Sequence, residues 1–188
     1  MLLKYYGDDK DEIQIGIDEV GRGCLAGPVV AAGVVFKRNT PFEEGLRDSK
    51  QMKESERLYW ADWIKEHALF YHIEYAMQAE VDRLNVLKAS IAAMLRCVDQ
   101  AIEEGVAPDH LLVDGNRFAT SLIPHTCIVK GDDKSLSIAA ASVLAKVERD
   151  TYMKKLHLDF PHYGWDTNVG YAAESHRRAI AEFGACDL

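Results

Sequence analysis

Apolar and polar residues alternate along several short stretches of the chain, which is the pattern of β-strands. The first stretch covers 13–17, where isoleucine occupies every second position. The apolar, β-branched run 28–36 follows a glycine-rich turn, so we predict that these two strands form a hairpin. Three more strands are predicted over 70–77, 110–113 and 122–129.

The stretches between the strands show the periodicity of helices, which are predicted over 54–66, 79–104, 135–158 and 174–183. The second helix keeps apolar residues three and four positions apart until Gly105 ends it. The third is rich in alanine, so we expect it to pack closely against a sheet. This order of strands and helices predicts an α/β fold, in which helices flank a central mixed five-stranded sheet.

Nothing in the sequence divides it into parts. It contains no internal repeats, low-complexity tracts or Pro- and Gly-rich linkers, so we predict one domain over 1–188. A chain of this length buries an adequate core without disulfides. The cysteines stand singly, away from any zinc-ligand spacing, which favours four reduced thiols, mostly buried in the core: Cys24, Cys97, Cys127 and Cys186.

The composition is that of a globular protein without a membrane segment. Hydrophobic residues make up 48% of the chain, yet no apolar stretch approaches the ~20 residues that span a bilayer. The stretch 1–12 turns acidic before an apolar run develops, so we predict no signal peptide. We therefore expect a monomeric, cytoplasmic protein with no membrane partner.

The net charge of −8 bears on the choice of substrate. Proteins that bind nucleic acid by neutralising phosphates usually carry a basic surface, so the charge alone favours an acidic small-molecule enzyme. An acidic chain can still bind a duplex if its acids surround metal ions and its basic residues gather at the rim of the site.

Asp18 and Glu19 stand near the end of the first predicted strand. Neighbouring side chains of a regular strand point to opposite faces, so these carboxylates converge only where the pleat breaks. Gly21 and Gly23 follow at once and permit such a break. An Asp-Glu pair in this position is equally compatible with a solvated strand edge.

Asp114 and Asp132 occupy similar positions at the ends of later strands. Asp114 precedes Gly115, and Asp-Gly is also the commonest signal of a tight hairpin. Asp132 and Asp133 precede a predicted helix, so one of them is also expected as its N-terminal cap. Capping needs only one of the pair, which leaves the other free.

Together these acids predict a metal site made only of oxygen ligands. Carboxylates at the ends of separate strands, with no His or Cys at ligand spacing, suit hard cations such as Mg²⁺ or Mn²⁺ and do not suit zinc. Carboxylate cages of this kind support phosphoryl transfer with two metal ions. The residue pattern therefore indicates a metal-dependent phosphoryl-transfer enzyme.

Several motifs resemble the signature of ribonuclease HII, the type 2 ribonucleases H. The chain has I-G-I-D-E-V-G-R-G at 15–23 and L-A-G-P-V-V at 25–30. The resemblance continues through R-D-S-K, V-D-G-N and K-G-D to an alanine-rich segment that ends in A-K-V-E-R-D at 145–150. It finishes with Y-G, G-Y and His176, and it spans nearly the whole chain in the family's order.

The resemblance implies an RNase H-like fold and an endonuclease. Its substrates would be the RNA strand of RNA–DNA hybrids and duplex DNA with single embedded ribonucleotides, which it would incise on their 5′ side. The resemblance further implies that Asp18, Glu19, Asp114 and Asp132 are catalytic and hold two Mn²⁺ or Mg²⁺ ions. The products would carry 3′-hydroxyl and 5′-phosphate ends.

The resemblance also implies contacts to nucleic acid. The backbone of Gly21, Arg22 and Gly23 would contact the 2′-hydroxyl, which two glycines favour because they allow close approach. Tyr171 would pack against the sugar beside the cut, and Lys50 would meet a phosphate. Without a ligand, Tyr171 is also compatible with an aromatic residue covering a helix start, and Lys50 with an ordinary surface lysine.

The chain departs from the family pattern at a few positions. Asn168 and Val169 replace a basic pair, Ala173 stands where threonine is expected, and Lys53 replaces a small hydroxyl residue. These changes leave the four acids and Tyr171 in place but predict weaker substrate binding.

Two rival functions fit parts of the same pattern. One is another carboxylate nuclease of the RNase H-like fold, such as a Holliday-junction resolvase, and the Gly-Arg-Gly turn argues against it because only a ribose-sensing enzyme needs that turn. The other is a non-catalytic duplex-binding module, against which the complete set of acids argues.

Overall fold

The computed structural model describes residues 2–7, 12–41, 45–119 and 121–188. Its strands are β1 (Gln14–Val20), β2 (Val29–Phe36), β3 (Ala68–Ala76), β4 (His110–Asp114) and β5 (His125–Ile128). Its α-helices are α1 (Glu54–His67), α2 (Gln78–Leu84), α3 (Val86–Glu103), α4 (Leu136–Asp159), α5 (Trp165–Asn168) and α6 (Glu174–Phe183). Short 3-10 helices cover Ser49–Gln51, Gly131–Asp133 and Pro161–Tyr163.

The strands form a mixed sheet in the order β3-β2-β1-β4-β5. The pairs β1–β2 and β2–β3 are antiparallel, whereas β1–β4 and β4–β5 are parallel. The predicted five-stranded mixed sheet and its first hairpin are therefore confirmed. Because β4 and β5 run in parallel, the alternative of a tight hairpin at Asp114-Gly115 is wrong.

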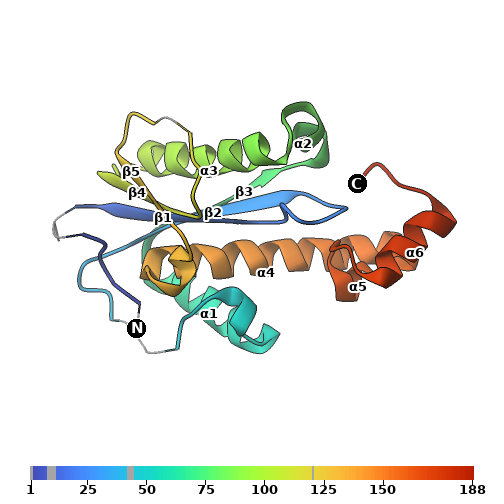
Figure 1. The fold of residues 1–188 in the computed structure, drawn as a ribbon. Helices are drawn as coiled ribbons and strands as arrows, with labels where there is room; N and C mark the ends of the chain where they lie inside the picture. Colours follow the sequence, from blue (N-terminus) through green and yellow to red (C-terminus); the bar gives the residue numbers. More distant parts are fainter. Residues whose placement is uncertain (1, 8–11, 42–44, 120) are drawn as a thin grey trace.

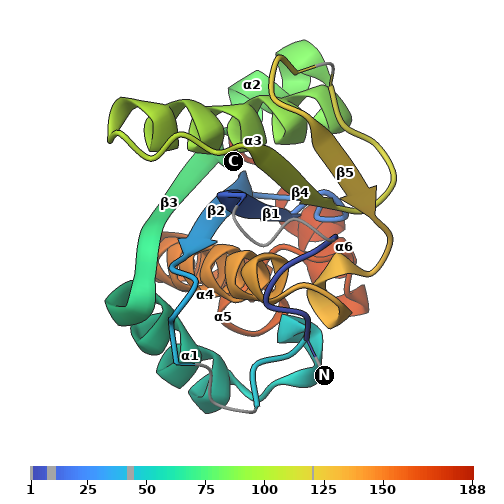
Figure 2. The same ribbon diagram turned by 90° about the vertical axis from the view of Figure 1, so that its left-hand side faces the viewer.

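Helices cover both faces of the sheet, with α2 and α3 on one face and α1 and α4 on the other (Figures 1 and 2). The α4 face is the closer contact, as its alanine content predicted. At Gly16 in β1 there is no room for a Cβ atom, because the main chain of Ser137 and Ile138 in α4 lies directly above it. Ala139, Ala140 and other small residues of α4 are completely buried there.

The α3 face of the sheet carries a second apolar core. Ile15 and Ile17 of β1 pack there with Ala93 and Cys97 of α3, and all four are fully buried. Strand β1 is thus covered on both faces, which places its carboxyl-terminal residues in a rigid setting.

The helix predicted over 79–104 is interrupted, so that prediction is corrected. Asn85 adopts a φ of 71° between α2 and α3, and its side chain accepts hydrogen bonds from the N–H groups of Leu87 and Lys88. Asparagine tolerates this backbone conformation and caps helices well, so it ends one helix and starts the next. Apolar periodicity runs through the break because both helices face the same core.

Two other sequence predictions concern the burial of the cysteines and the lack of a membrane segment. All four cysteines are free thiols, but only Cys97 is buried, so the expectation that most of them fill the core is wrong. In the described part of the chain, no helix is long and apolar enough to cross a bilayer.

Candidate active site

The sheet topology brings the predicted acids to one edge. Strands β1, β4 and β5 are parallel to one another, so their carboxyl ends point the same way. Asp18 and Glu19 lie near the end of β1, and Asp114 is the last residue of β4. Asp132 lies in the short 3-10 helix that follows β5. Side chains separated by more than a hundred positions in sequence therefore share one end of the sheet.

A cleft of about 450 Å³ opens at this edge. Its lining combines acidic, basic and aromatic side chains from β1, the Ser49–Gln51 turn, α1, α4 and the segment before α6. The lining residues are Asp18, Glu19, Val20, Ser49, Lys50, Arg57, Ser142, Lys146 and Tyr171. Four of the nine site residues predicted from the sequence thus meet in one concave surface.

Asp18 and Glu19 both reach the cleft although the pleat does not break between them. Strand β1 continues through both residues to Val20, so the expected break is not observed. Asp18 is 5% exposed, and its carboxylate accepts a hydrogen bond from the N–H of Glu19. The carboxylate of Glu19 lies 2.7 Å from the Arg22 guanidinium. Because the cleft opens at the strand end, it contacts side chains from either face of β1.

Asp114 and Asp132 are connected through the backbone that follows β5. A carboxylate oxygen of Asp114 accepts a 2.7 Å hydrogen bond from the N–H of Gly131. Asp132 is 5% exposed and lies 3.8 Å from the ammonium group of Lys50. The alternative in which Asp132 or Asp133 caps α4 is not supported. No side chain caps the start of that helix, and Asp133 accepts a hydrogen bond from Gln51 instead.

The four carboxylates influence one another electrostatically. Burial raises the pKa of Asp18 well above its ordinary value, and repulsion by Glu19 and Asp114 raises it further. Burial, and then repulsion by Asp114, raises the pKa of Asp132 to about 6. Burial also raises the pKa of Glu19, although the hydrogen bond from Arg22 opposes that shift. Mutual repulsion of this kind requires the acids to be close neighbours.

The chemistry of these donors fits a hard divalent cation, because all four offer carboxylate oxygens. A cation would also relieve the repulsion that contributes to the raised pKa values of Asp18, Glu19 and Asp132. Among the described residues, however, no three His, Cys, Asp or Glu side chains are spaced as ligands of a single ion. Ion binding therefore requires the carboxylates to turn closer together.

The two glycines of the turn after β1 have different roles. Gly21 has a φ of 108°, and a Cβ atom there would lie 2.6 Å from both the Arg149 side chain and the carbonyl of Pro28. Gly21 is therefore required by the fold. Gly23 has nothing within 4 Å of the position a Cβ would take, so the fold leaves its surface open.

Tyr171 stands against the turn that follows β1. Its backbone forms an isolated bridge with Cys24, and the residue as a whole is 37% exposed. The ammonium group of Lys146 lies 5.4 Å from the centre of the Tyr171 ring. Tyr171 lines the cleft and also stands just before α6, so its position is compatible with both of the predicted roles.

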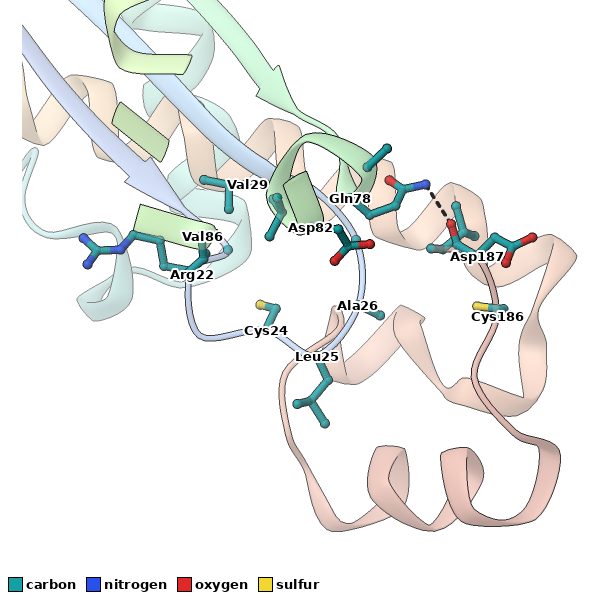
Figure 3. A pocket seen from close by; sticks show the side chains of 15 residues that line it. Arg22, Cys24, Leu25, Ala26, Val29, Gln78, Asp82, Val86, Cys186 and Asp187 are labelled. Atoms are coloured by element: carbon teal, nitrogen blue, oxygen red, sulfur yellow. Dashed lines mark hydrogen bonds between the residues drawn. The ribbon is translucent and has the colours of Figure 1, made fainter. Parts of the chain in front are cut away.

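A larger cavity, of about 650 Å³, lies beside the same turn (Figure 3). It is bordered by Arg22, Cys24 and Leu25, by α2, and by the C-terminal segment, which Gln78 holds through a hydrogen bond to the carbonyl of Asp187. Asp82 and Asp187 make its wall acidic, and none of the four acids at the sheet edge lines it. We therefore place the chemistry in the smaller cleft.

Several side chains at the cleft were not singled out from the sequence. Ser142 shares a hydrogen bond with the buried Asp18, and Arg57 and Lys146 supply positive charge from α1 and α4. Arg149 lies completely buried behind the turn. The A-K-V-E-R-D motif contains two of these residues, but helical periodicity alone does not show which face of α4 meets the cleft.

Comparisons with known proteins identify the family of this chain. A family model described as Ribonuclease HII matches residues 15–188. Ribonuclease HII of Bacteroides thetaiotaomicron is 49% identical over 185 residues, which cover 98% of this chain and 90% of that protein. Ribonuclease HII of Porphyromonas gingivalis is 45% identical with the same coverage.

Solved structures share the fold at low sequence identity. Ribonuclease H2 from Pyrococcus horikoshii OT3 superimposes with a TM-score of 0.73 at 20% identity, over 92% of this chain and 89% of that chain. Bst-RNase HIII in complex with Mn²⁺ gives a TM-score of 0.70 at 20% identity, over 92% and 63% of the two chains. The fold is thus the RNase H-like fold. The chain belongs to the Ribonuclease HII family, and it is a type 2 ribonuclease H, an endonuclease.

Proposed function

We propose that this enzyme hydrolyses the RNA strand of RNA–DNA hybrids and incises duplex DNA on the 5′ side of single embedded ribonucleotides. The observation that carries the proposal is the meeting of two kinds of residue in one place. Asp18, Glu19 and Tyr171 line the same cleft, and Asp114 and Asp132 lie at the same end of the sheet without lining it. The open surface of Gly23 belongs to the turn that follows β1. A site of this form can cut a phosphodiester and inspect the adjoining sugar together.

In the proposed mechanism, Asp18, Glu19, Asp114 and Asp132 would hold two Mg²⁺ or Mn²⁺ ions. When bound, these ions would supply Lewis-acid chemistry for phosphodiester hydrolysis, lowering the pKa of a water and neutralising charge on the departing 3′ oxygen. The oxygen-only donor set supports this assignment, as does the Mn²⁺ complex of the similar Bst-RNase HIII. The carboxylates orient the reacting groups, and the products carry 3′-hydroxyl and 5′-phosphate ends.

The sugar is inspected by the turn and by the tyrosine. The backbone N–H groups of Gly21, Arg22 and Gly23 donate to the 2′-hydroxyl, and Tyr171 packs against the same sugar. A site built to hydrogen-bond a hydroxyl rejects the analogue that lacks it, because its polar groups are then left unpaired. Arg22 is held toward the acids by its ion pair with Glu19, which keeps this turn beside the reacting phosphate.

Positive charge at the cleft supports duplex binding by a chain of net charge −8. Lys50 is 75% exposed at its side chain and stands beside Asp132, where it would meet a phosphate. Arg57 and Lys146 line the same cleft, where both form ion pairs with Asp150, and add positive charge to its rim. The charge at the site thus differs from the average over the surface. We also propose that 1–188 acts as one catalytic domain and as a cytoplasmic monomer.

The proposal is tested with four labelled duplexes of one sequence: a hybrid, a DNA duplex with one ribonucleotide, an all-RNA duplex and an all-DNA duplex. Each is incubated with Mg²⁺, with Mn²⁺ or with EDTA, and the product ends are mapped on denaturing gels. Metal-dependent cleavage of the first two, leaving 5′-phosphates, supports the function. Cleavage that persists in EDTA, or products that carry 2′,3′-cyclic phosphates, would contradict it.

A further inference from the structure

Arg149 is a buried arginine that the proposed chemistry does not use. Its exposure is 0%, although arginine is among the residues least often fully buried. Burial of an ion is costly unless hydrogen bonds compensate for the lost water. The position of this guanidinium therefore requires a structural reason.

The reason lies in its three hydrogen bonds, all of which go to main-chain carbonyls. Nε donates to Pro28 at 2.8 Å and Nη2 donates to Ala26 at 2.9 Å, both in the segment after β1. Nη1 donates to Val169 at 2.7 Å, two residues before Tyr171. The planar fork of one guanidinium therefore joins two segments about 140 positions apart in sequence.

The two joined segments are those that face the sugar in the proposed function. The first is the continuation of the Gly21–Gly23 turn, and the second carries Tyr171. They also meet directly, because the N–H of Leu25 donates to the carbonyl of Gly170 at 2.8 Å. The guanidinium carbon of Arg149 lies 5.9 Å from the centre of the Tyr171 ring.

Glycines make this close packing possible. A Cβ atom on Gly21 would lie 2.6 Å from Nε of Arg149, and one on Gly170 would lie 3.2 Å from its Nη2. Both glycines have positive φ, at 108° and 86°. The turn after β1 and the tyrosine segment are therefore wrapped around the same side chain.

A second contact fixes the tyrosine segment from the other side. The indole N–H of Trp165 donates to Nε2 of the buried His176, so the proton of a neutral His176 is on Nδ1. That Nδ1 donates to the carbonyl of Tyr171 at 2.9 Å. Arg149 and His176 thus hold the backbone on both sides of Gly170.

We infer that Arg149 is a positioning residue for ribonucleotide selectivity: it holds the Gly21–Gly23 turn and Tyr171 at a fixed separation, and it takes no part in metal binding. The inference rests on the proposed function, since it assigns a purpose to the spacing of those two elements. Loss of the guanidinium releases three carbonyls and separates the segments, while the acids stay in place on β1 and β4.

The test compares Arg149→Lys and Arg149→Met with Ile64→Ala. Ile64 is fully buried in α1, away from the turn, so its truncation lowers stability without touching either segment. Lysine keeps the charge but lacks the planar fork, so it cannot reproduce the three hydrogen bonds. Rates are measured on the single-ribonucleotide duplex and on the continuous hybrid, below the melting temperature of every variant.

Both Arg149 variants are expected to lose activity on the single ribonucleotide by about 10- to 100-fold more than on the hybrid, because small displacements of a positioning group have effects of that size. Ile64→Ala is expected to affect the two substrates equally. An equal loss on both substrates in the Arg149 variants would overturn the inference and leave Arg149 as a plain stability residue.

Hydrogen exchange separates this inference from the proposed function. In Arg149→Lys the amide of Leu25 is expected to exchange at least ~10-fold faster, while the amide of Leu111, which donates to Pro124 at the far edge of the sheet, is unchanged. Unchanged exchange at Leu25 would refute the positioning role even if the wild-type enzyme selects ribonucleotides. If the wild-type enzyme does not select ribonucleotides, the proposed function fails. The exchange rate of the Leu25 amide then decides by itself whether Arg149 joins the two segments.

Discussion

A carboxylate oxygen of Asp114 accepts a 2.7 Å hydrogen bond from the N–H of Gly131, and this bond ties the end of β4 to the turn that carries Asp132. The side chain of Asp114 is thus fixed directly to the main chain beside Asp132. Within the described part of the chain, the Asp132 side chain makes no hydrogen bond to this turn, and it forms an ion pair with Lys50 at 3.8 Å. Neutralising Asp132 should therefore change the charge of the site while its geometry is kept.

The first prediction concerns that neutralisation. Asp132→Asn and Asp18→Asn should abolish cleavage and leave the fold intact, because an amide keeps the size of the side chain and removes the charge. Circular dichroism and nicking assays decide the matter. Asp133→Asn is the matched control, since Asp133 neighbours Asp132 but accepts a hydrogen bond from Gln51 and is not assigned to the metal site. A variant of Asp18 or Asp132 that cuts at near the wild-type rate would remove that acid from the site.

The second prediction concerns stability in EDTA as a function of pH. The pKa of Asp132 rises from 3.8 to about 6 on folding, so the folded state binds the proton more tightly and its stability falls as pH rises across that window. Asp132→Asn avoids this loss. Its melting temperature should match that of the wild type near pH 4 and exceed it at pH 7.5 by about 2–4 °C, equivalent to roughly 1 kcal/mol after solvent screening.

Metal should reverse that order. Mg²⁺ or Mn²⁺ at about 100 times the dissociation constant stabilises the binding-competent protein by about 2.7 kcal/mol. The wild type should therefore melt above Asp132→Asn once metal is added at pH 7.5. An identical metal response in both proteins would show that Asp132 holds no ion.

A third prediction separates the two glycines of the turn. Gly21→Ala should destabilise the protein by more than 1 kcal/mol, because alanine is strained at a φ of 108° and its Cβ would meet Arg149 and the Pro28 carbonyl. Gly23→Ala should keep the wild-type melting temperature, because its Cβ would meet open space. If the turn contacts the sugar, Gly23→Ala should nevertheless lose most of its activity on the single ribonucleotide. Full activity in this variant would show that no close approach occurs there.

The sequence predicted a mixed five-stranded sheet flanked by helices, and it placed the four acids at or just after the ends of separate strands. Those features follow from local apolar periodicity. That β1, β4 and β5 are parallel and bring the acids to one end of the sheet is known only from the fold. The sequence did not predict the interruption at Asn85, because the apolar residues of α2 and α3 pack against the same core and keep one periodicity through the break. It did not predict Arg149 either, since an arginine in a charged helical motif gives no local signal of burial.

The departures from the family motif are also explained only in three dimensions. Asn168 accepts a hydrogen bond from the N–H of Gly170 and donates one to the carbonyl of Tyr163. Val169 is held at a φ of 40° with its carbonyl bound by Arg149. Asn168 and Val169 therefore shape the loop before Tyr171. The sequence alone shows only that they stand where the family has a basic pair.

A fourth prediction addresses the tyrosine. Tyr171→Ala should lower activity on the single ribonucleotide more than on the hybrid, where the neighbouring sugars are also RNA. Tyr171→Phe, which keeps the ring, should retain most of the activity if the contact is one of packing. Kinetics of both variants on both substrates provide the comparison. Equal losses on the two substrates in Tyr171→Ala would reduce Tyr171 to a packing residue.

The most direct test of the account is the ratio of initial cleavage rates on two duplexes that differ by a single 2′-hydroxyl. One contains a lone ribonucleotide and the other is all DNA, and both are incubated with excess enzyme and Mn²⁺. We expect one nick on the 5′ side of the ribonucleotide and a rate ratio of ~10⁴ or more, as for sites built around a hydroxyl. Comparable cleavage of the two duplexes, or a cut at another position, would contradict it.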